Sequence, residues 1–188
     1  MTAFDYLSVL LSIVLGLAIT QLLSGFAGLV RARDRMVMYW PLPVQMTFVF
    51  LVSVQMWWSL FGLHNARHWT FGLFLIVLMQ PVTVYLMAAF ITPDVSGEGR
   101  VDLRAIYFRE RAWFFGASLF TLAVSLAKNF FVNQGPPAAA DMVGHAIFAT
   151  TALAGLLSRN DLVHKIIAPV TLLVFAAYIA LLFVQLPG

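Results

Sequence analysis

Residues 4–30 read FDYLSVLLSIVLGLAITQLLSGFAGLV, and residues 31–35, which follow directly, read RARDR. The first stretch holds one charged residue, Asp5, and is longer than the about 20 apolar residues that cross a hydrocarbon core about 30 Å thick. Five further stretches of this kind follow, at 39–63, 69–93, 112–133, 139–158 and 166–186. The sequence therefore predicts an all-α membrane protein, a bundle of six transmembrane helices.

The composition leaves no room for a separate soluble domain. Of 188 residues, 62% are hydrophobic and 10% are charged, so we expect residues 1–188 to form a single transmembrane domain. Cysteine is absent, which excludes disulfide bonds, thiol catalysis and iron–sulfur clusters. The sequence names no cofactor.

The basic residues are distributed unevenly between the two sides of the predicted bundle. Nine of the eleven Lys and Arg residues lie at the first, third and fifth connections: Arg31, Arg33, Arg35, Arg100, Arg104, Arg109, Arg111, Arg159 and Lys165. Only Arg67 and Lys128 fall on the other side. The positive-inside rule then places both termini on the side of the membrane away from the cytoplasm. We expect this membrane to be the cell membrane of a bacterium. We also expect anionic lipid head groups as partners and no nucleic acid.

The connection 94–111 is the longest, and its second half has an amphipathic pattern. Leu103, Ile106 and Tyr107 share one face, opposite Asp102 and Arg104. The pattern favours a short helix lying on the inner membrane surface. A solvated loop is the alternative interpretation.

Small residues recur at every fourth position of the first predicted helix, which lets another backbone approach closely. They are Ser8, Ser12, Gly16, Thr20, Ser24 and Gly28. Packing inside the monomer, a dimer contact and a hydrated path all remain open, and the small size of the chain favours a homo-oligomer.

The run 4–20, with the arginine-rich loop that follows the helix, resembles the start of uncharacterised small bacterial multi-pass membrane proteins. The resemblance covers the first quarter of the chain. It implies a membrane location and brings no activity with it.

The third and sixth predicted helices share a segment. Residues 81–91 and 169–179 are identical at six of eleven positions, at an offset of 88 residues, and each begins Pro-Val-Thr. This match predicts a duplication into halves 1–93 and 101–188. Because each half has three spans, the halves would be inverted relative to each other, as in many transporters.

Proline inside a helix removes a backbone hydrogen bond and bends the helix, and paired interrupted helices are typical of transport sites. We therefore predict a channel or small-solute transporter whose site lies between the third and sixth helices. The predicted pore residues are Gln80, Pro81, Thr83, Tyr85, Pro169 and Thr171. No charged residue is expected at that depth, which favours a neutral solute or a cation bound by carbonyls and hydroxyls.

Charged side chains flank the fourth connection. Lys128 lies near the end of the fourth helix, and Asp141 and His145 lie at the start of the fifth. The sequence predicts a Lys128–Asp141 ion pair, or an outer vestibule that includes His145.

Two less specific patterns remain. Three histidines are expected on the outer side of the bundle: His64, His68 and His145. We predict that they lie at the membrane interface, and the alternative is that they bind a metal ion or ligate a haem. The latter would suit a non-catalytic haem- or quinone-binding subunit of a larger membrane complex. Ser118 in Gly-Ala-Ser and His164 are similar to the layout of rhomboid intramembrane serine proteases, although Leu119 replaces that family's glycine.

Overall fold

Six long helices make up the computed structural model, which describes residues 3–65, 69–97, 99–132, 135 and 137–182. Two short 3₁₀ helices and two short strands lie in the connections. In chain order the elements are α1 Ala3–Arg31, η1 Arg33–Arg35, β1 Met36–Val37, α2 Pro41–Leu60, η2 Phe61–Asn65, α3 Phe71–Ile91, β2 Val101–Asp102, α4 Leu103–Val132, α5 Ala139–Leu157 and α6 Asp161–Leu182. All six α-helices are long and apolar enough to cross a membrane, which confirms the predicted multi-pass, all-helical class.

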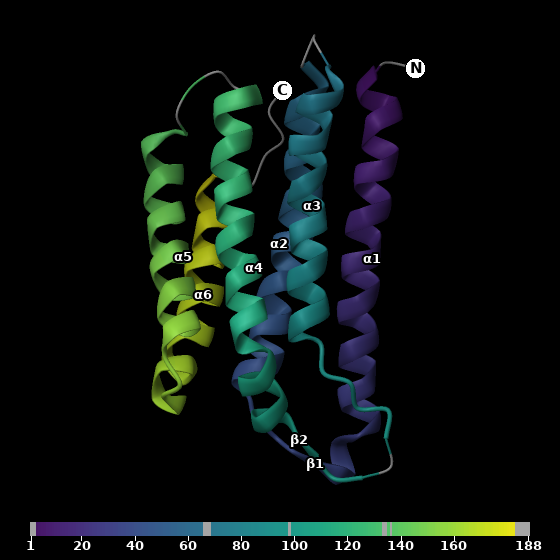
Figure 1. Cartoon of the computed structure of the whole chain (residues 1–188), viewed down its shortest axis with the longest axis vertical. Coiled ribbons are helices and arrows are strands. Elements are labelled where there is room, and N and C mark those ends of the chain that lie inside the picture. The colour runs from purple at the N-terminus through teal and green to yellow at the C-terminus, as the bar shows by residue number, and fades with distance from the viewer. Residues whose placement is uncertain (1–2, 66–68, 98, 133–134, 136, 183–188) are drawn as a thin grey trace.

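Successive helices run in opposite directions, so alternate connections gather at the same end (Figure 1). The connections 31–40, 92–102 and 158–160 lie at one end of the bundle. We call it the basic end, because all nine of the clustered basic residues named above lie in these connections or within about three helical turns of them. Here β1 pairs in parallel with β2, Met36 facing Val101. Arg35 strengthens this link by donating to the carbonyl oxygens of Gly99, at 2.8 Å, and Val95.

The predicted surface helix before the fourth span is not a separate element. Residues 103–111 are the first turns of α4, a continuous helix of 30 residues. Asp102 begins it, because its Oδ1 accepts from the backbone N–H groups of Arg104 and Ala105. Leu103 and Tyr107 are buried, so the amphipathic face packs on the protein rather than on lipid.

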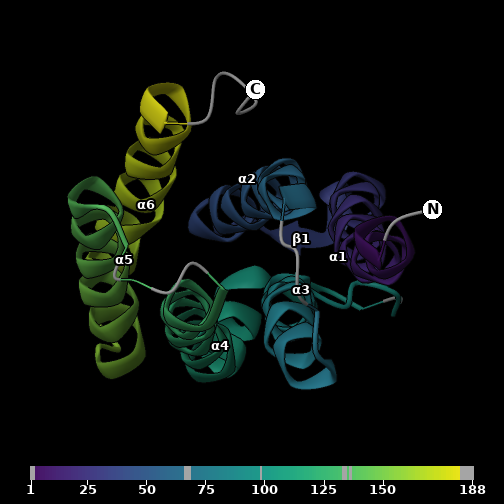
Figure 2. The same ribbon diagram turned by 90° about the horizontal axis from the view of Figure 1, so that it is seen from above.

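Viewed from above, the helices follow the order α1, α2, α6, α5, α4, α3 around the bundle (Figure 2). Each is packed on its two neighbours, and α2 also contacts α3 and α4. This order gives no support to the predicted inverted halves. An inverted duplication would relate the extensive α3–α4 contact to an α6–α1 contact, yet α2 separates α6 from α1.

Apolar side chains at helical spacing fill the contacts. On α1, Leu11, Leu15, Ala18 and Leu22 are fully buried. The small-residue row lies elsewhere on this helix, and its central members Gly16, Thr20 and Ser24 are exposed. Packing inside the monomer, one of the three interpretations of that row, therefore does not account for its middle.

Candidate functional site: a cavity inside the bundle

A cavity of about 130 Å³ lies among α2, α3, α4, α5 and α6. Aromatic and aliphatic side chains make up most of its wall, interrupted by amides, hydroxyls and one imidazole. The lining residues are Gln45, Phe48, Val52, Gln55, Met56, Gln80, Met87, Phe114, Phe115, Ser118, Thr121, Leu122, Ser125, Gly144, His145, Phe148, Thr151, Ala152, Thr171, Phe175 and Tyr178. Among the described residues, no Asp, Glu, Lys or Arg lines it.

The cavity is elongated along the helices. Gln45 and Gln55 are ten positions apart on α2, which corresponds to about 15 Å of helix rise. On α4 the lining runs from Phe114 to Ser125, a similar length. The wall therefore extends over about half of a hydrocarbon core about 30 Å thick.

Three phenylalanines from three helices meet at the middle of the wall. Phe48 of α2 lies 5.4 Å from Phe175 of α6 and 6.0 Å from Phe148 of α5, measured between ring centroids. These ring contacts pack α2 against α5 and α6. All three rings belong to the lining of the cavity.

Most hydroxyls of the wall are bonded to their own helix. Ser118 donates to the Phe114 carbonyl at 2.9 Å, Thr151 to that of Phe148 at 3.0 Å, and Thr171 to that of Ile167 at 2.9 Å. A hydroxyl that donates to its backbone still has lone pairs that accept. These hydroxyl oxygens can therefore accept hydrogen bonds from a molecule in the cavity, while their own protons stay bonded to the backbone.

The amide of Gln45 is different. The side chain is 1% exposed, and neither Nε2 nor Oε1 has a hydrogen-bond partner among the described residues. A buried amide without partners costs several kcal/mol, on the order of 2–7 by transfer measurements. It is the one cavity residue whose polar atoms are fully buried and unpaired in the described part of the chain.

At the end away from the basic residues, His145 and Tyr178 close the wall with a polar cluster. His145 Nδ1 donates to the Asp141 carbonyl at 2.7 Å, and its Nε2 lies 3.1 Å from the Ser125 hydroxyl. Tyr178 donates to Asp141 Oδ1 at 2.8 Å. In the neutral imidazole, Nδ1 carries the proton and Nε2 accepts from Ser125.

The predicted Lys128–Asp141 ion pair is not formed at contact distance. Lys128 and Asp141 are not among the described ion pairs, whose nitrogen and oxygen atoms lie within 4.0 Å of each other. The Asp141 carboxylate instead accepts a hydrogen bond from Tyr178 on α6. Lys128 lies near the end of α4 and Asp141 in the first turn of α5, on either side of the connection between these helices. The two residues thus lie at the same end of the bundle, as expected, beside the cavity rather than in it.

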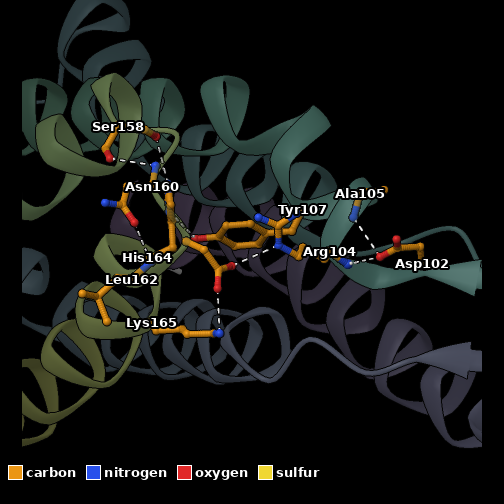
Figure 3. Close-up of polar contacts among 10 residues, drawn as sticks. Asp102, Arg104, Ala105, Tyr107, Ser158, Asn160, Leu162, His164 and Lys165 are labelled. Carbon is orange, nitrogen blue, oxygen red and sulfur yellow. Dashed lines mark hydrogen bonds and ion pairs between the residues drawn. The ribbon is translucent and has the colours of Figure 1, made fainter.

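Toward the basic end, Phe115 forms the floor. Its ring enters a notch at Gly155 of α5, where an added Cβ would lie 2.4 Å from Phe115 Cζ. Behind it His164 is completely buried, 5.7 Å from the Phe115 ring. Figure 3 shows Tyr107 and His164 pointing toward each other, with Tyr107 Oη 3.0 Å from Nδ1.

This histidine is a packing group whose hydrogen bonds are complete. Its Nε2 donates to the Ser158 carbonyl at 3.0 Å, which also accepts from Arg111 at 3.2 Å, so Nδ1 is free to accept from Tyr107. Ser118 instead donates to its own helix. The serine–histidine pairing of the protease interpretation is therefore absent from the described structure.

Tyr39 completes the layer behind the floor, with its ring centroid 5.2 Å from that of Tyr107. Burial and the nearby Asp161 carboxylate raise the pKa of Tyr39, which keeps its hydroxyl protonated. Asp161 itself is held by Arg104 at 3.1 Å and Lys165 at 2.6 Å. The charges of Asp161, Arg104 and Lys165 thus pair with one another at the basic end, outside the lining of the cavity.

The six predicted pore residues are only partly brought together. Gln80 and Thr171 line the cavity from α3 and α6. Pro81 and Thr83 are buried outside its lining, Pro169 is half-buried, and Tyr85 is 36% exposed. Both prolines lie inside continuous helices.

The two predicted pore threonines bond to their own backbones. Thr83 donates to the Gln80 carbonyl at 2.8 Å and Thr171 to those of Ile167 and Ala168. The carbonyls four residues before the prolines belong to Val77 and Lys165, so the threonines do not replace the bonds that proline removes.

The histidine ligands are not assembled. His64 Nδ1 is bonded to the Phe61 carbonyl at 2.8 Å, and both nitrogens of His145 are engaged. His68, like Arg67, lies outside the described residues. Within the described ranges no group of three or more His, Cys, Asp or Glu residues could hold a metal ion.

Comparison of the chain with known proteins gives no relative from which a function can be transferred. No family model matches it, and neither a curated protein nor a solved structure does so. The functional argument therefore depends on the cavity itself.

Proposed function

We propose that the protein is a channel or transporter for a small neutral solute, and that the cavity among α2–α6 is its solute site. The observation that carries the proposal is a cavity inside a six-helix bundle whose described lining residues present amides and hydroxyls but no carboxylate, ammonium or guanidinium group. Polar groups inside a membrane bundle are costly, and they commonly mark a substrate pathway. A wall of neutral donors and acceptors suits a neutral, hydrogen-bonding solute.

The volume limits what can bind. Pockets for drug-sized molecules usually measure about 300–1,000 Å³, whereas a cavity of about 150 Å³ accommodates benzene. At about 130 Å³, this cavity suits a molecule of a few heavy atoms or about four waters, each taking about 30 Å³. Haem is far too large for it.

A quinone- or haem-binding subunit of a larger complex is the second candidate. Its support is the predominantly apolar wall with His145 at one end. Against it stand the volume and the engaged imidazole nitrogens. A visible absorption spectrum of the pure protein tests for haem, and the ultraviolet spectrum of an organic extract tests for a quinone. A solute channel would give neither signal.

For the orientation we propose that the basic end faces the cytoplasm of a bacterial cell membrane, where it contacts anionic lipid head groups. We further propose a homo-oligomer joined through the exposed small residues of α1, Gly16, Thr20 and Ser24. Passage of a solute to the basic end requires Phe115 to move, since its ring fills the notch at Gly155.

Osmotic swelling of proteoliposomes tests the function. Protein-containing vesicles should take up glycerol or acetamide faster than protein-free vesicles, and should not conduct K⁺ or Na⁺. Thr151→Trp should block uptake because Thr151 lines the cavity, whereas Thr150→Trp, on the exposed face of the same helix, should not. Equal uptake by protein-containing and protein-free vesicles would contradict the proposal.

A further inference from the structure

Gln45 is the cavity residue whose hydrogen-bonding capacity is entirely unused. Its amide is buried in the part of the wall nearest the basic end, and no described group bonds to it. The aromatic rings of Phe48 and Phe115 line the same cavity. A buried amide without hydrogen bonds destabilises a folded protein. Gln45 is therefore better explained by a ligand that enters the cavity and bonds to the amide than by a contribution to stability.

We propose that Gln45 recognises a small primary carboxamide through a reciprocal pair of N–H···O=C hydrogen bonds. The inference rests on the proposed function, since it names the class of solute for the same cavity. In the pair, Nε2 donates to the carbonyl oxygen of the solute and Oε1 accepts from its NH₂ group. Both unpaired atoms of the side chain are thereby satisfied together.

Other solutes of this size match less well. A ketone only accepts hydrogen bonds, so it leaves Gln45 Oε1 without a partner. A hydroxyl group has a single oxygen, whereas the Gln45 amide has a donor and an acceptor on two different atoms. A carboxylate would bring a negative charge into a wall whose described residues include no Lys or Arg. An ammonium ion lacks an acceptor for Nε2.

The size and shape of the cavity agree with this class. Acetamide and propionamide are smaller than benzene, which fits a cavity of about 150 Å³. Their planar amide groups can stack on phenylalanine rings such as Phe48 and Phe115, which line the wall that Gln45 shares. Gln55 and Gln80 lie further along the same wall and offer a second and a third amide for passage.

The test compares acetamide with glycerol in proteoliposomes that contain the full chain. Gln45→Met keeps the length and the volume of the side chain but removes both polar atoms. It should lower acetamide permeability about tenfold relative to the parent, because two neutral hydrogen bonds are lost, and should lower glycerol permeability by a clearly smaller factor. Gln21→Met is the matched control, since Gln21 lies on α1 outside the cavity.

The outcomes separate the two proposals. Selective loss of acetamide uptake in Gln45→Met, with a thermal unfolding midpoint at or above that of the parent, supports the recognition role. Glycerol uptake that persists while acetamide uptake is unchanged by Gln45→Met overturns this inference and leaves the solute channel intact. No uptake of either solute by the parent overturns both.

Discussion

Replacement of Gln45 by methionine should stabilise the protein in the absence of solute. An unsatisfied buried polar group costs about 1–3 kcal/mol, and this substitution removes two such atoms from a side chain that is 1% exposed. A volume-conserving change in a packed interior costs less than about 1.5 kcal/mol. The net expectation is a gain of about 1 kcal/mol in the free energy of unfolding, or about 2–4 °C in Tm for a chain of this length.

The assay is thermal or denaturant unfolding in detergent micelles, with Gln21→Met as the control. Gln21 is partly exposed outside the cavity, so its replacement should change the free energy of unfolding by no more than about 0.5 kcal/mol. A gain of stability combined with loss of solute uptake is typical of a residue kept for function. A loss of more than about 2 kcal/mol in Gln45→Met would refute the reasoning, because it would mean that the amide is bonded in the folded protein.

Three other changes test separate parts of the structure. Cysteine at Gly97 should react with an impermeant maleimide only after lysis, and cysteine at Gly62 should react in intact cells; the reverse pattern would contradict the proposed orientation. Gly155→Ala should lower the free energy of unfolding by about 1–3 kcal/mol, because its Cβ meets the floor phenylalanine, while Gly116→Ala, which meets nothing, should not destabilise; equal effects would contradict the notch. Gly16→Cys should form disulfide-linked dimers in oxidised membranes, whereas the control Gly116→Cys on α4 should not. Failure of Gly16→Cys to form dimers would contradict α1 as the oligomer contact.

Hydropathy was sufficient to predict the class of the fold. Each span is an apolar stretch of membrane length, and the basic residues fall at the connections that the structure gathers at one end. The segment 103–111 was misjudged because its charges suggest an interface, whereas its buried Leu103 and Tyr107 make it the start of α4. Burial by a neighbouring helix cannot be distinguished from burial by lipid in one sequence.

The cavity could be predicted only in part. The proline pair identified α3 and α6, and Gln80 and Thr171 of those helices do line it. Gln45 was missed because α2 is apolar around most of its circumference, so no periodicity indicates which side faces the interior. One signal was present: an amide inside an apolar span is costly in lipid, and a functional hypothesis can be based on that cost.

Blocking the cavity with a thiol reagent tests the central claim most directly, since the chain has no cysteine of its own. Ser118→Cys places the only thiol in the cavity wall, and Phe120→Cys, two positions along α4, places it on the exposed face. After reaction with N-ethylmaleimide, verified by mass spectrometry, solute uptake should be abolished in Ser118→Cys proteoliposomes and unchanged in Phe120→Cys proteoliposomes. Full uptake by completely labelled Ser118→Cys protein would show that no solute passes through this cavity.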